Sequence, residues 1–441
     1  MSDKPSIFEE ITIESNDKLR TVDVRLGTIS IDYYEDIFSP TITAKLVVTN
    51  TGNTVEGKDG EMESIYNGLP LRGGERVSLF VKANSDSNVD LDFRTKADDY
   101  LYVSSINNVI SEKQTESFVL NLVSRESITN ETTRVIRKYP GSSAISASAE
   151  NILEEVLQTR KTLNIDQSAN KYGFIGNLRK PFTVLTWLAS KAVPESSKES
   201  STAGYVFFQT KEGYHFKALD NLIAAKVKDN YYYADQTPDS EKYDVDKQIL
   251  TYATNRNQNL LEKLRLGAYS SVRMYFDPLT FQFTDPGKQG FTQDQYAGKT
   301  KNLGKKLQLP RLSDATDRGL GESPSRIFTG VLDRGTLEPD VKTDTNADPF
   351  EHQSQSLMRY NVMFTQSMTM TVPLNTTLNA GDIIGCSFPR RTTSDAKEFD
   401  QEQSGLYMIK ELCHHFDKDG SYTSMQLIRD TTGLHGKNNE Q

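Results

Sequence analysis

The sequence predicts a mainly β protein of the α+β class. It has two similar small antiparallel β-barrels, an intervening mixed α/β domain and a long polar insertion. Apolar and polar residues alternate in short runs at both ends of the chain, and the two ends share a weak internal repeat. We expect the first barrel at residues 1–130, the mixed domain at 131–248 and the second barrel at 249–441, interrupted at about 286–355.

Size and charge limit the classes of protein that fit. The 441 residues carry a net charge of −9, and the 20 Phe and 20 Tyr suffice for several modest cores. Sequence-independent nucleic-acid binding needs clustered Lys and Arg to displace phosphate counterions. The densest basic pieces are the short runs RVIRK and LRK, so we expect no specific nucleic-acid binding.

The first residues and the cysteines bear on the compartment. MSDKPSIFEE has no apolar core, so we expect no secretory signal. The apolar runs fall short of the ~20 residues that a membrane span needs, so we expect no membrane insertion. Cys386 and Cys413 are too few for a disulfide framework. These features favour a chain made in a cytoplasm.

The first region is predicted to form short strands. Alternation of apolar and polar residues places one side of each strand on a core. Clusters of Gly, Asn and Asp separate these runs and favour turns. The alternating residues are Ile11 and Ile13, then Val22, Val24 and Leu26, then Ile29 and Ile31, and later Val77, Leu79 and Val81.

The middle region changes to helical periodicity. One helix is expected in ISASAENILEEVLQTR, with Ser146 and Ser148 as candidate N-caps. A second begins at Pro181, because proline suits the first turn. The strand-like GYVFFQTKEGYHF follows, with Glu212 and Gly213 as its turn. The predicted buried residues are Ala149, Ile152, Leu153, Val156 and Leu157 in the first helix, and Phe182, Leu185, Leu188 and Ala189 in the second.

The last region begins with the insertion. Residues 286 to about 350 are poor in apolar side chains and rich in Gly, Asp, Thr and Lys, which indicates a long or partly ordered loop. Strands resume with VMFTQSMTMTV and continue to about Asp430. One side of the resumed strand is expected to carry Val362, Phe364, Met368, Met370 and Val372, with Gln366 breaking the pattern.

An internal repeat links the two β regions. Each has Leu-x-x-Gly followed by an acid, then a Leu-Tyr strand start, then a closing apolar pair. A Gly-acid turn before a hairpin of fixed length explains the pattern, and two unrelated hairpins are the alternative. Leu-Tyr and the closing pair are 21 residues apart in both copies (101 to 122 and 406 to 427). The matched residues are Leu71, Gly74, Glu75, Leu101, Tyr102, Leu122 and Val123, and Leu378, Gly381, Asp382, Leu406, Tyr407, Leu427 and Ile428.

The histidines are the first candidates for chemistry. His414 and His415 lie on the predicted strand LYMIKELCHHF, and adjacent strand residues point to opposite sides, so the two cannot easily bind one metal. Cys413 and His415 share a side, but zinc needs two more ligands, and only His215 and His352 are left before the tail. One side is expected to carry Tyr407, Ile409, Glu411, Cys413 and His415, and the other Leu406, Met408, Lys410, Leu412, His414 and Phe416.

Other chemical motifs are absent from the sequence. It has no H-E-x-x-H, phosphate-binding Gly loop, G-x-S-x-G or C-x-x-C. The DKDG turn does not meet the EF-hand spacing, and the acidic run Asp344 to Glu351 is more typical of a solvated loop than of a calcium site. Trp187 is expected in a core. We therefore predict no catalytic, cofactor-binding or metal-binding residues, no cofactor and no enzyme activity, although a pair of hydrolytic carboxylates stays open.

Two β regions that share a Gly-acid turn and a Leu-Tyr hairpin, separated by a mixed segment, resemble the baseplate hub subunit of contractile-tailed bacteriophages. The related hub part of type VI secretion spike proteins is similar. The resemblance lies in the opening FEEITIES…VDVRLGTISIDYYEDIFSPTITAKLVVTNT, in YGFIGNLRKPFTVLTWLASKA with GYVFFQTKEGYHF, and in SGLYMIKELCHHFDKDGSYTSMQLIRD. Together these cover about half of the chain, and none is a catalytic signature.

This resemblance implies a structural virion protein. Three chains, each with two barrels of the tail-tube type, would form a ring that joins the sixfold tail tube to the threefold central spike, with DNA passing through its lumen. The implied partners are further copies of the chain, the tail spike protein, tail tube or tube-initiator proteins, and baseplate wedge proteins. The implied location is the tail baseplate, after assembly in the host cytoplasm. A tail-associated cell-wall hydrolase and a carbohydrate-binding adhesin are the alternatives.

Overall fold

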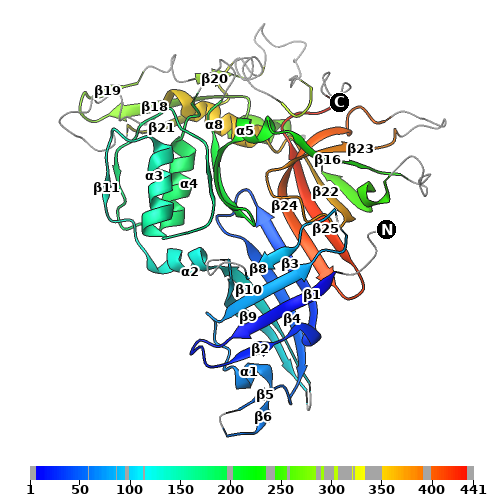
Figure 1. Ribbon diagram of the computed structural model, residues 1–441. Coiled ribbons are helices and arrows are strands. Elements are labelled where there is room, and N and C mark those ends of the chain that lie inside the picture. Colours follow the sequence, from blue (N-terminus) through cyan, green and yellow to red (C-terminus); the bar gives the residue numbers. More distant parts are fainter. Residues whose placement is uncertain are drawn as a thin grey trace.

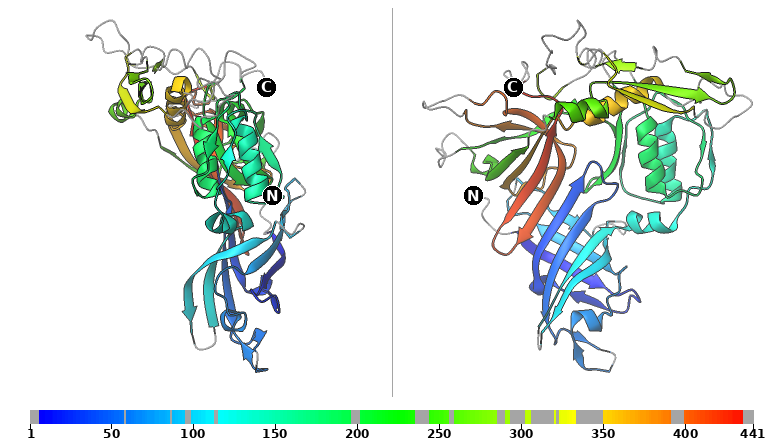
Figure 2. Two further views of the ribbon diagram at one scale, coloured as in Figure 1. Left: turned by 90° about the vertical axis from the view of Figure 1, so that its left-hand side faces the viewer. Right: turned by 180° about the vertical axis from the view of Figure 1, so that it is seen from behind.

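The computed structural model describes residues 6–434, apart from 58, 86, 95–98, 113–114, 196–201, 235–243, 256–258, 285–289, 293–301, 306–319, 321–322, 333–349 and 391–398. In Figure 1 the strands of the N-terminal region lie at the bottom, those of the C-terminal region at the right, and the helices of the middle region at the left. Seen from behind, the N-terminal and C-terminal strands lie side by side (Figure 2).

The first β unit is the name used here for the main strands between residues 7 and 124. Its alternating side chains form one core, which includes Ile11, Ile31 and Val77. Leu26 is 94 % exposed, against the prediction, because it lies in a short 3-10 turn rather than in a strand. The strands are β1 (Ile7–Glu14), β2 (Thr21–Asp23), β3 (Thr28–Asp36), β4 (Thr43–Thr51), β7 (Arg76–Lys82), β8 (Leu91–Phe93), β9 (Leu101–Ser111) and β10 (Thr115–Ser124), with β5 (Val55–Glu56), β6 (Met62–Glu63) and α1 (Ile65–Gly68) attached.

The second β unit is the name for the corresponding strands of the C-terminal half, which enclose a separate core. On β22 the buried side carries Met368, Met370 and Val372 as predicted, and also Gln366, which accepts a hydrogen bond from Arg429 at 2.5 Å. Val362 belongs to the preceding helix, so the predicted strand begins too early. The strands are β16 (Val227–Tyr232), β17 (Thr251–Asn255), β22 (Gln366–Pro373), β23 (Ile383–Ser387), β24 (Gly405–Asp417) and β25 (Ser421–Arg429), with the short helix η3 (Val245–Lys247).

One 14-stranded sheet runs through both β units. Its order is β17-β22-β25-β24-β3-β4-β10-β9-β7-β1-β2, with β23 beside β24, β16 beside β23 and β8 beside β7. Every described pair in it is antiparallel except β16 with β23. The prediction of a mainly β protein with antiparallel sheets is therefore confirmed, and the continuity of the sheet is a feature that the sequence did not predict.

The middle segment packs helices against a small sheet, as predicted. The predicted helix faces are buried except for Val156, which like Trp187 lies partly buried against that core. Two predictions are wrong in detail: Ser146 and Ser148 lie inside the first helix, because Ala144 is its N-cap, and the hairpin turn is Lys211-Glu212. The elements are α2 (Arg125–Thr132), β11 (Lys138–Tyr139), α3 (Ile145–Asn151), η2 (Ile152–Val156), β12 (Leu163–Ile165), β13 (Phe174–Ile175), α4 (Pro181–Lys191), β14 (Tyr205–Thr210), β15 (Gly213–Ala218) and α5 (Leu219–Ile223).

The insertion expected at about 286–355 is described in part. Part of it lies outside the described residues, and its described part includes two strands that the sequence did not predict, β20 and β21. Among the described helices, none is long and apolar enough to cross a membrane. The elements here are α6 (Leu260–Leu266), β18 (Ser270–Asp277), β19 (Gln282–Phe283), β20 (Gly290–Thr292), β21 (Arg326–Val331) and α8 (Phe350–Val362).

A buried arginine fixes α8 to the rest of the molecule. The guanidinium of Arg359 has no exposed surface and lies 2.7 Å from the Asp220 carboxylate of α5 and 3.0 Å from that of Asp430, which follows β25. Asp430 also accepts the N–H of Leu303 at 3.0 Å. Arg359 and Asp430 together therefore connect the middle segment, the insertion and the second β unit.

Replacing Arg359 with Met should lower the free energy of unfolding by about 3–5 kcal/mol, because two buried carboxylates lose their countercharge. Urea unfolding monitored by circular dichroism measures the change. The control is Lys305→Met, since the ion pair of Lys305 with Glu402 is half exposed and should contribute less than about 1 kcal/mol. Equal losses in the two variants would contradict the anchoring role of Arg359.

Candidate assembly site at the joint of the two β units

The two β units meet edge to edge where β3 pairs with β24 (Figure 1). This antiparallel ladder runs from the pair Glu411–Asp36 to the pair Asp417–Ser30. Phe416 of β24 lies in the core of the first β unit, although its strand belongs to the second. The joint therefore combines main-chain hydrogen bonds with a shared apolar core.

A buried carboxylate joins three parts of the chain at this place. Glu35 of β3 is 1 % exposed. Its Oε1 accepts the Lys211 N–H of the β14–β15 turn at 2.7 Å and the Tyr33 hydroxyl at 2.8 Å. Its Oε2 accepts the Ala380 N–H, in the loop before β23, at 2.9 Å. The first β unit, the middle segment and the second β unit thus all contact one side chain.

The charge on Glu35 is balanced by Lys211, a lysine that is partly exposed. Burial lowers the pKa of Lys211, and the nearby carboxylates, Glu35 among them, oppose that shift. Burial raises the pKa of Glu35, and the charge of Lys211 and the three hydrogen bonds oppose that shift. The Lys211 ammonium donates to the carbonyl oxygen of Leu378 at 2.7 Å. Because the charge of Lys211 compensates that of the buried Glu35, removing Lys211 would leave a buried carboxylate without a countercharge.

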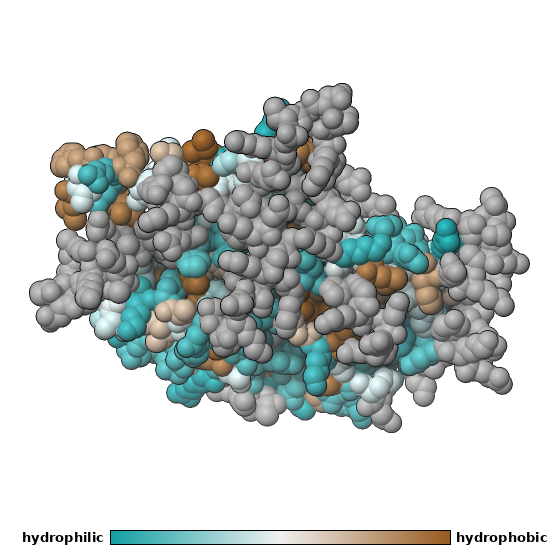
Figure 3. All heavy atoms as spheres, turned by 90° about the horizontal axis from the view of Figure 1, so that it is seen from above, coloured by the Kyte–Doolittle hydropathy of each residue, from teal (hydrophilic) through white to brown (hydrophobic). Residues whose placement is uncertain are grey.

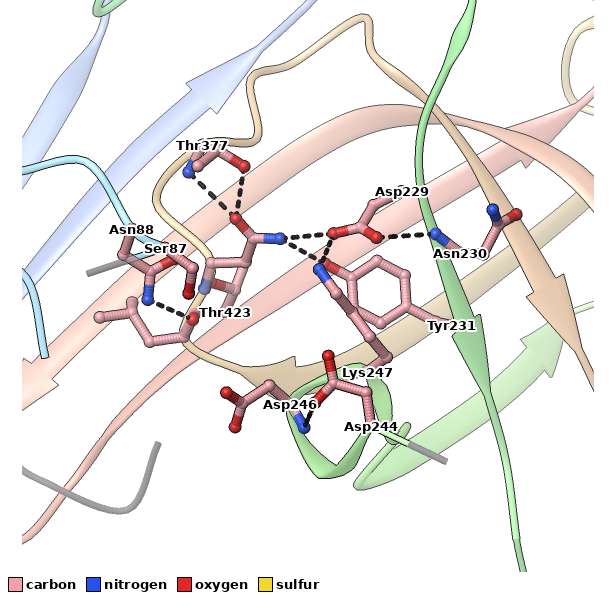
Figure 4. A network of polar contacts seen from close by, with 12 residues as sticks. Ser87, Asn88, Asp229, Asn230, Tyr231, Asp244, Asp246, Lys247, Thr377 and Thr423 are labelled. Carbon is pink, nitrogen blue, oxygen red and sulfur yellow. Dashed lines mark hydrogen bonds and ion pairs between the residues drawn. The ribbon is translucent and has the colours of Figure 1, made fainter. Parts of the chain in front are cut away.

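A polar network fixes the loop that carries Ala380 (Figure 4). Asn375 donates to Asp229 at 2.9 Å and to the Tyr231 hydroxyl at 2.8 Å, both on β16. From the first β unit, Asn88 donates to the carbonyl oxygen of Leu374 at 2.9 Å. The loop between β22 and β23 is therefore held from both β units.

The two adjacent histidines lie on opposite sides of β24, as predicted. His414 is fully buried, its Nδ1 is 3.0 Å from the Thr423 hydroxyl, and burial lowers its pKa to about 3. His415 is partly exposed, with its two ring nitrogens 2.5 Å from Asp32 and 3.1 Å from Asp417. Burial opposes protonation of His415, but these two hydrogen bonds prevail and raise its pKa. His415 thus links β24 to β3 across the joint, whereas the hydrogen bond of His414 lies within the second β unit.

The predicted sides of β24 are wrong before Lys410. A β-bulge between Ile409 and Glu411 shifts the alternation by one residue, so Tyr407 and Ile409 are buried with Leu412 instead of lying on the side of Cys413. In the part of the chain that the structure describes, no three His, Cys, Asp or Glu side chains form a metal-binding group. The acidic run 344–351 lies outside the described residues, except where α8 begins.

The Gly-acid turn of the repeat has the same geometry in both β units. The Gly74 N–H donates to the Val103 carbonyl oxygen at 2.7 Å, and the Gly381 N–H donates to that of Ile409 at 2.8 Å. Val103 and Ile409 each donate back to the carbonyl oxygen of the acid that follows the glycine, at 2.9 Å. The glycines have φ values of +89° and +93°, which favour residues without a Cβ atom.

The acids of the two turns also act alike. The Glu75 carboxylate accepts the N–H of Arg72 at 2.7 Å, and that of Asp382 accepts the N–H of Asn379 at 2.9 Å. In each case the donor lies three residues before the acid. The sequence pattern therefore marks a turn that the carboxylate itself closes.

The strand order is repeated as well. The first β unit has β3-β4-β10-β9-β7, and the second has β17-β22-β25-β24-β23. Both β9 and β24 have a bulge directly after the residue that contacts the glycine. That residue is two positions after Leu101 but three after Leu406, so the Leu-Tyr match in the sequence is out of register by one residue. Leu101 corresponds to Tyr407.

The exposed face of the long sheet is rich in hydroxyl groups. Residues paired across six consecutive strands form one row on this face, and all are exposed or partly exposed. Neighbouring rows add Asn121, Gln426 and Thr369, with a few charged groups such as Lys45 and Asp32. The row consists of Thr251, Thr371, Ser424, Cys413, Tyr34 and Thr43.

Glu35 and Lys211 were not among the residues predicted from the sequence. A signal was present, because Glu35 continues the apolar alternation of Ile31 and Tyr33 on the buried side of its strand. An acid at such a position indicates a buried partner. Periodicity alone cannot name that partner, which lies 176 residues away.

Substituting Glu35 by Ala should lower the free energy of unfolding by about 3–5 kcal/mol, since three donors and the Lys211 charge lose their acceptor. Denaturant unfolding measures it. The matched control is Asp36→Ala, whose ion pair with Lys410 is more exposed and should contribute about 1 kcal/mol or less. A Glu35→Ala chain as stable as the control would show that the carboxylate is dispensable.

The low pKa of the buried His414 predicts how the free energy of unfolding changes with pH. The unfolded chain takes up a proton near the ordinary pKa of 6.5, but the folded chain does so only near 3, so stability should fall as pH drops through that window. In His414→Asn the slope should be smaller by up to about 1.4 kcal/mol per pH unit. Urea unfolding of both chains at pH 7, 6, 5 and 4 tests this. Parallel pH profiles would contradict it.

Comparisons with known proteins agree with this architecture. No protein-family model matches the chain, and a search of curated proteins gives no match. A 43 kDa tail protein of prophage MuSo2 from Shewanella oneidensis is similar in structure, with a TM-score of 0.52 and 11 % identity over 96 % of this chain and 98 % of that chain. A tail protein from Neisseria meningitidis has a TM-score of 0.53 and 8 % identity over 95 % and 96 %. The chain has the fold of phage tail proteins.

Proposed function

We propose that the chain is a structural virion protein, the hub subunit of a tail baseplate, and that it works as a homotrimer. Each β unit would form a small barrel of the tail-tube type, so three chains would place six similar units in one ring. One observation carries this proposal. The two β units repeat the same strand order and the same Gly-acid turn, and they are joined edge to edge.

A ring with two similar units per chain has a mechanical use. A closed ring offers a partner only the symmetry that it has. Three chains with two alike units present near-sixfold symmetry on the side of the units and true threefold symmetry elsewhere. Such a ring would act as a symmetry adaptor between a sixfold tail tube and a threefold spike. The proposed domains are those expected from the sequence, divided at 130 and 248, with β16 added to the second barrel.

The hydroxyl-rich face of the long sheet would line the lumen. Nonspecific affinity for DNA comes mostly from Lys and Arg contacts with phosphates. The row across the sheet contains no Lys or Arg, and the chain has a net charge of −9. A lumen of this kind would let DNA pass without holding it. This role needs neither a catalytic residue nor a cofactor.

The insertion, together with the strands β18 and β19 that precede it, would face other baseplate proteins. Seen from above, apolar residues gather at the end occupied by β18 and β19 (Figure 3). Leu279, Phe281 and Phe283 are 61–80 % exposed there, and exposed apolar patches often mark interaction sites. We assign this part to contacts with wedge proteins, and the proposed location is the tail baseplate after assembly in the host cytoplasm.

The purified chain should have a native mass of three times 49.6 kDa in sedimentation velocity, or should form a complex that contains three copies of the chain together with the cognate spike when the spike is added. Trimer formation is expected because each chain contributes two similar β units, so that three chains complete a ring of six. A cell-wall digestion assay on the same sample serves as the control, and it should show no activity. A chain that stays monomeric when the spike is added, or a chain that digests cell wall, would contradict the proposal.

A further inference from the structure

β24 serves two partners along the same edge. Its beginning pairs with β23, through Met408 and Ile383, and its end pairs with β3, through Cys413 and Tyr34. The bulge after Ile409 separates the two parts. The second half of β24 thus provides the edge on which the other β unit is added.

The counterpart of β24 in the first β unit, β9, has only the first of these partners. Its beginning pairs with β7, through Tyr102 and Arg76. Beyond the bulge, residues 105–107 and 110–111 pair with β10 on one side, and the described part of the chain places no strand on the other side. Val109 and Ile110 on this edge are 43 % and 59 % exposed.

The counterpart of β3 in the second β unit is β17, and its outer edge is open too. β17 is the end strand of the sheet order and pairs only with β22 among the described strands. Its side chains are exposed or half-exposed in alternation. The open edge of β9 therefore corresponds to the edge of β24 that pairs with β3. The open edge of β17 corresponds to the edge of β3 that pairs with β24.

Neither edge carries a Pro or a charged side chain, two of the features that normally block edge pairing, although this part of β9 has one bulge, at Asn108. Natural proteins protect open strands with Pro, charged side chains or very short strands. Residues 105–111 read SINNVIS and residues 251–255 read TYATN, without a Pro or a charge. Both edges are therefore suited to add a strand.

We infer that the far half of β9 in one chain pairs antiparallel with β17 of the next chain, so that copies join through the same contact that joins the two units within a chain. This inference rests on the proposed ring. Three copies would then give six joints of one kind, three within chains and three between them. The contact is head-to-tail, which closes into a ring when the rotation permits.

The repeat also gives the register. Asn107 faces Val119 as Cys413 faces Ser424, so Asn107 corresponds to Cys413. Asn255 pairs with Ser367, which in turn pairs with Ile428. In the first β unit Tyr34 pairs with Thr43, which pairs with Val123, the counterpart of Ile428. Asn255 therefore corresponds to Tyr34. The internal pair Cys413–Tyr34 thus predicts the pair Asn107–Asn255 between chains. β9 has a second bulge at Asn108, where φ is +52°, so the pair chosen precedes it.

Cysteine cross-linking tests this register. Asn107→Cys and Asn255→Cys are combined in a Cys413→Ser chain, oxidised with copper phenanthroline and run on non-reducing denaturing gels. Bands at two and three chain masses are expected, since facing Cα atoms lie within disulfide reach. Each single variant gives the background. The register control pairs Asn107→Cys with Thr251→Cys, displaced by four residues or about 13 Å along the strand. Tyr34→Cys opposite the native Cys413 is the positive control within one chain.

The outcomes separate this inference from the proposed function. Cross-linking of the Asn107–Asn255 pair above the register control supports both. A native trimer without that cross-link overturns the β9–β17 joint and leaves the hub proposal standing. A monomer without cross-link, alone or with the spike, overturns both. As a second test, Val109→Lys with Ala253→Lys should reduce the trimer fraction at least tenfold with an unchanged unfolding midpoint, because both side chains are exposed.

Discussion

The carboxylate of Glu35 is the contact on which the arrangement of the molecule depends. Glu35 lies on β3 and accepts hydrogen bonds from the β14–β15 turn and from the loop before β23. Three segments far apart in the chain are thereby fixed at the point where the two β units become one sheet. A buried charge is a costly way to make such a contact, but its geometric demands are strict. A joint that must hold an exact angle between two units gains from that strictness.

Duplication explains why the sheet can be continuous. Because both units use the same turn, the same bulge and the same strand order, the edge that one unit offers fits the strand that the other provides. An open edge on a single β unit would be an aggregation hazard. With two units in one chain, the edges of β3 and β24 pair with each other inside the chain. The corresponding edges of β17 and β9 remain open. If the open edges pair between chains in the same way, three chains would form a ring with six equivalent joints.

The sequence predicted the local structure better than the joint. Alternation and helical spacing identified most strands and both main helices, and the Gly-acid pattern identified a turn that proves identical in the two units. The bulge at Lys410 was not predictable from period two, and it reversed the assigned sides of Tyr407 and Ile409. The pairing of β3 with β24 and the contact of Glu35 with Lys211 join residues too distant for any periodicity to connect. Tertiary geometry decides such contacts.

The central claim is that the chain holds two equivalent units that close a ring with those of other chains. Electron microscopy of the native assembly, with image classes averaged without imposed symmetry, tests it most directly. We expect a ring of six similar lobes around an open centre, with alternate lobes distinguished by the middle segments and insertions. A compact particle without a central opening, or a ring with one lobe per chain, would contradict it.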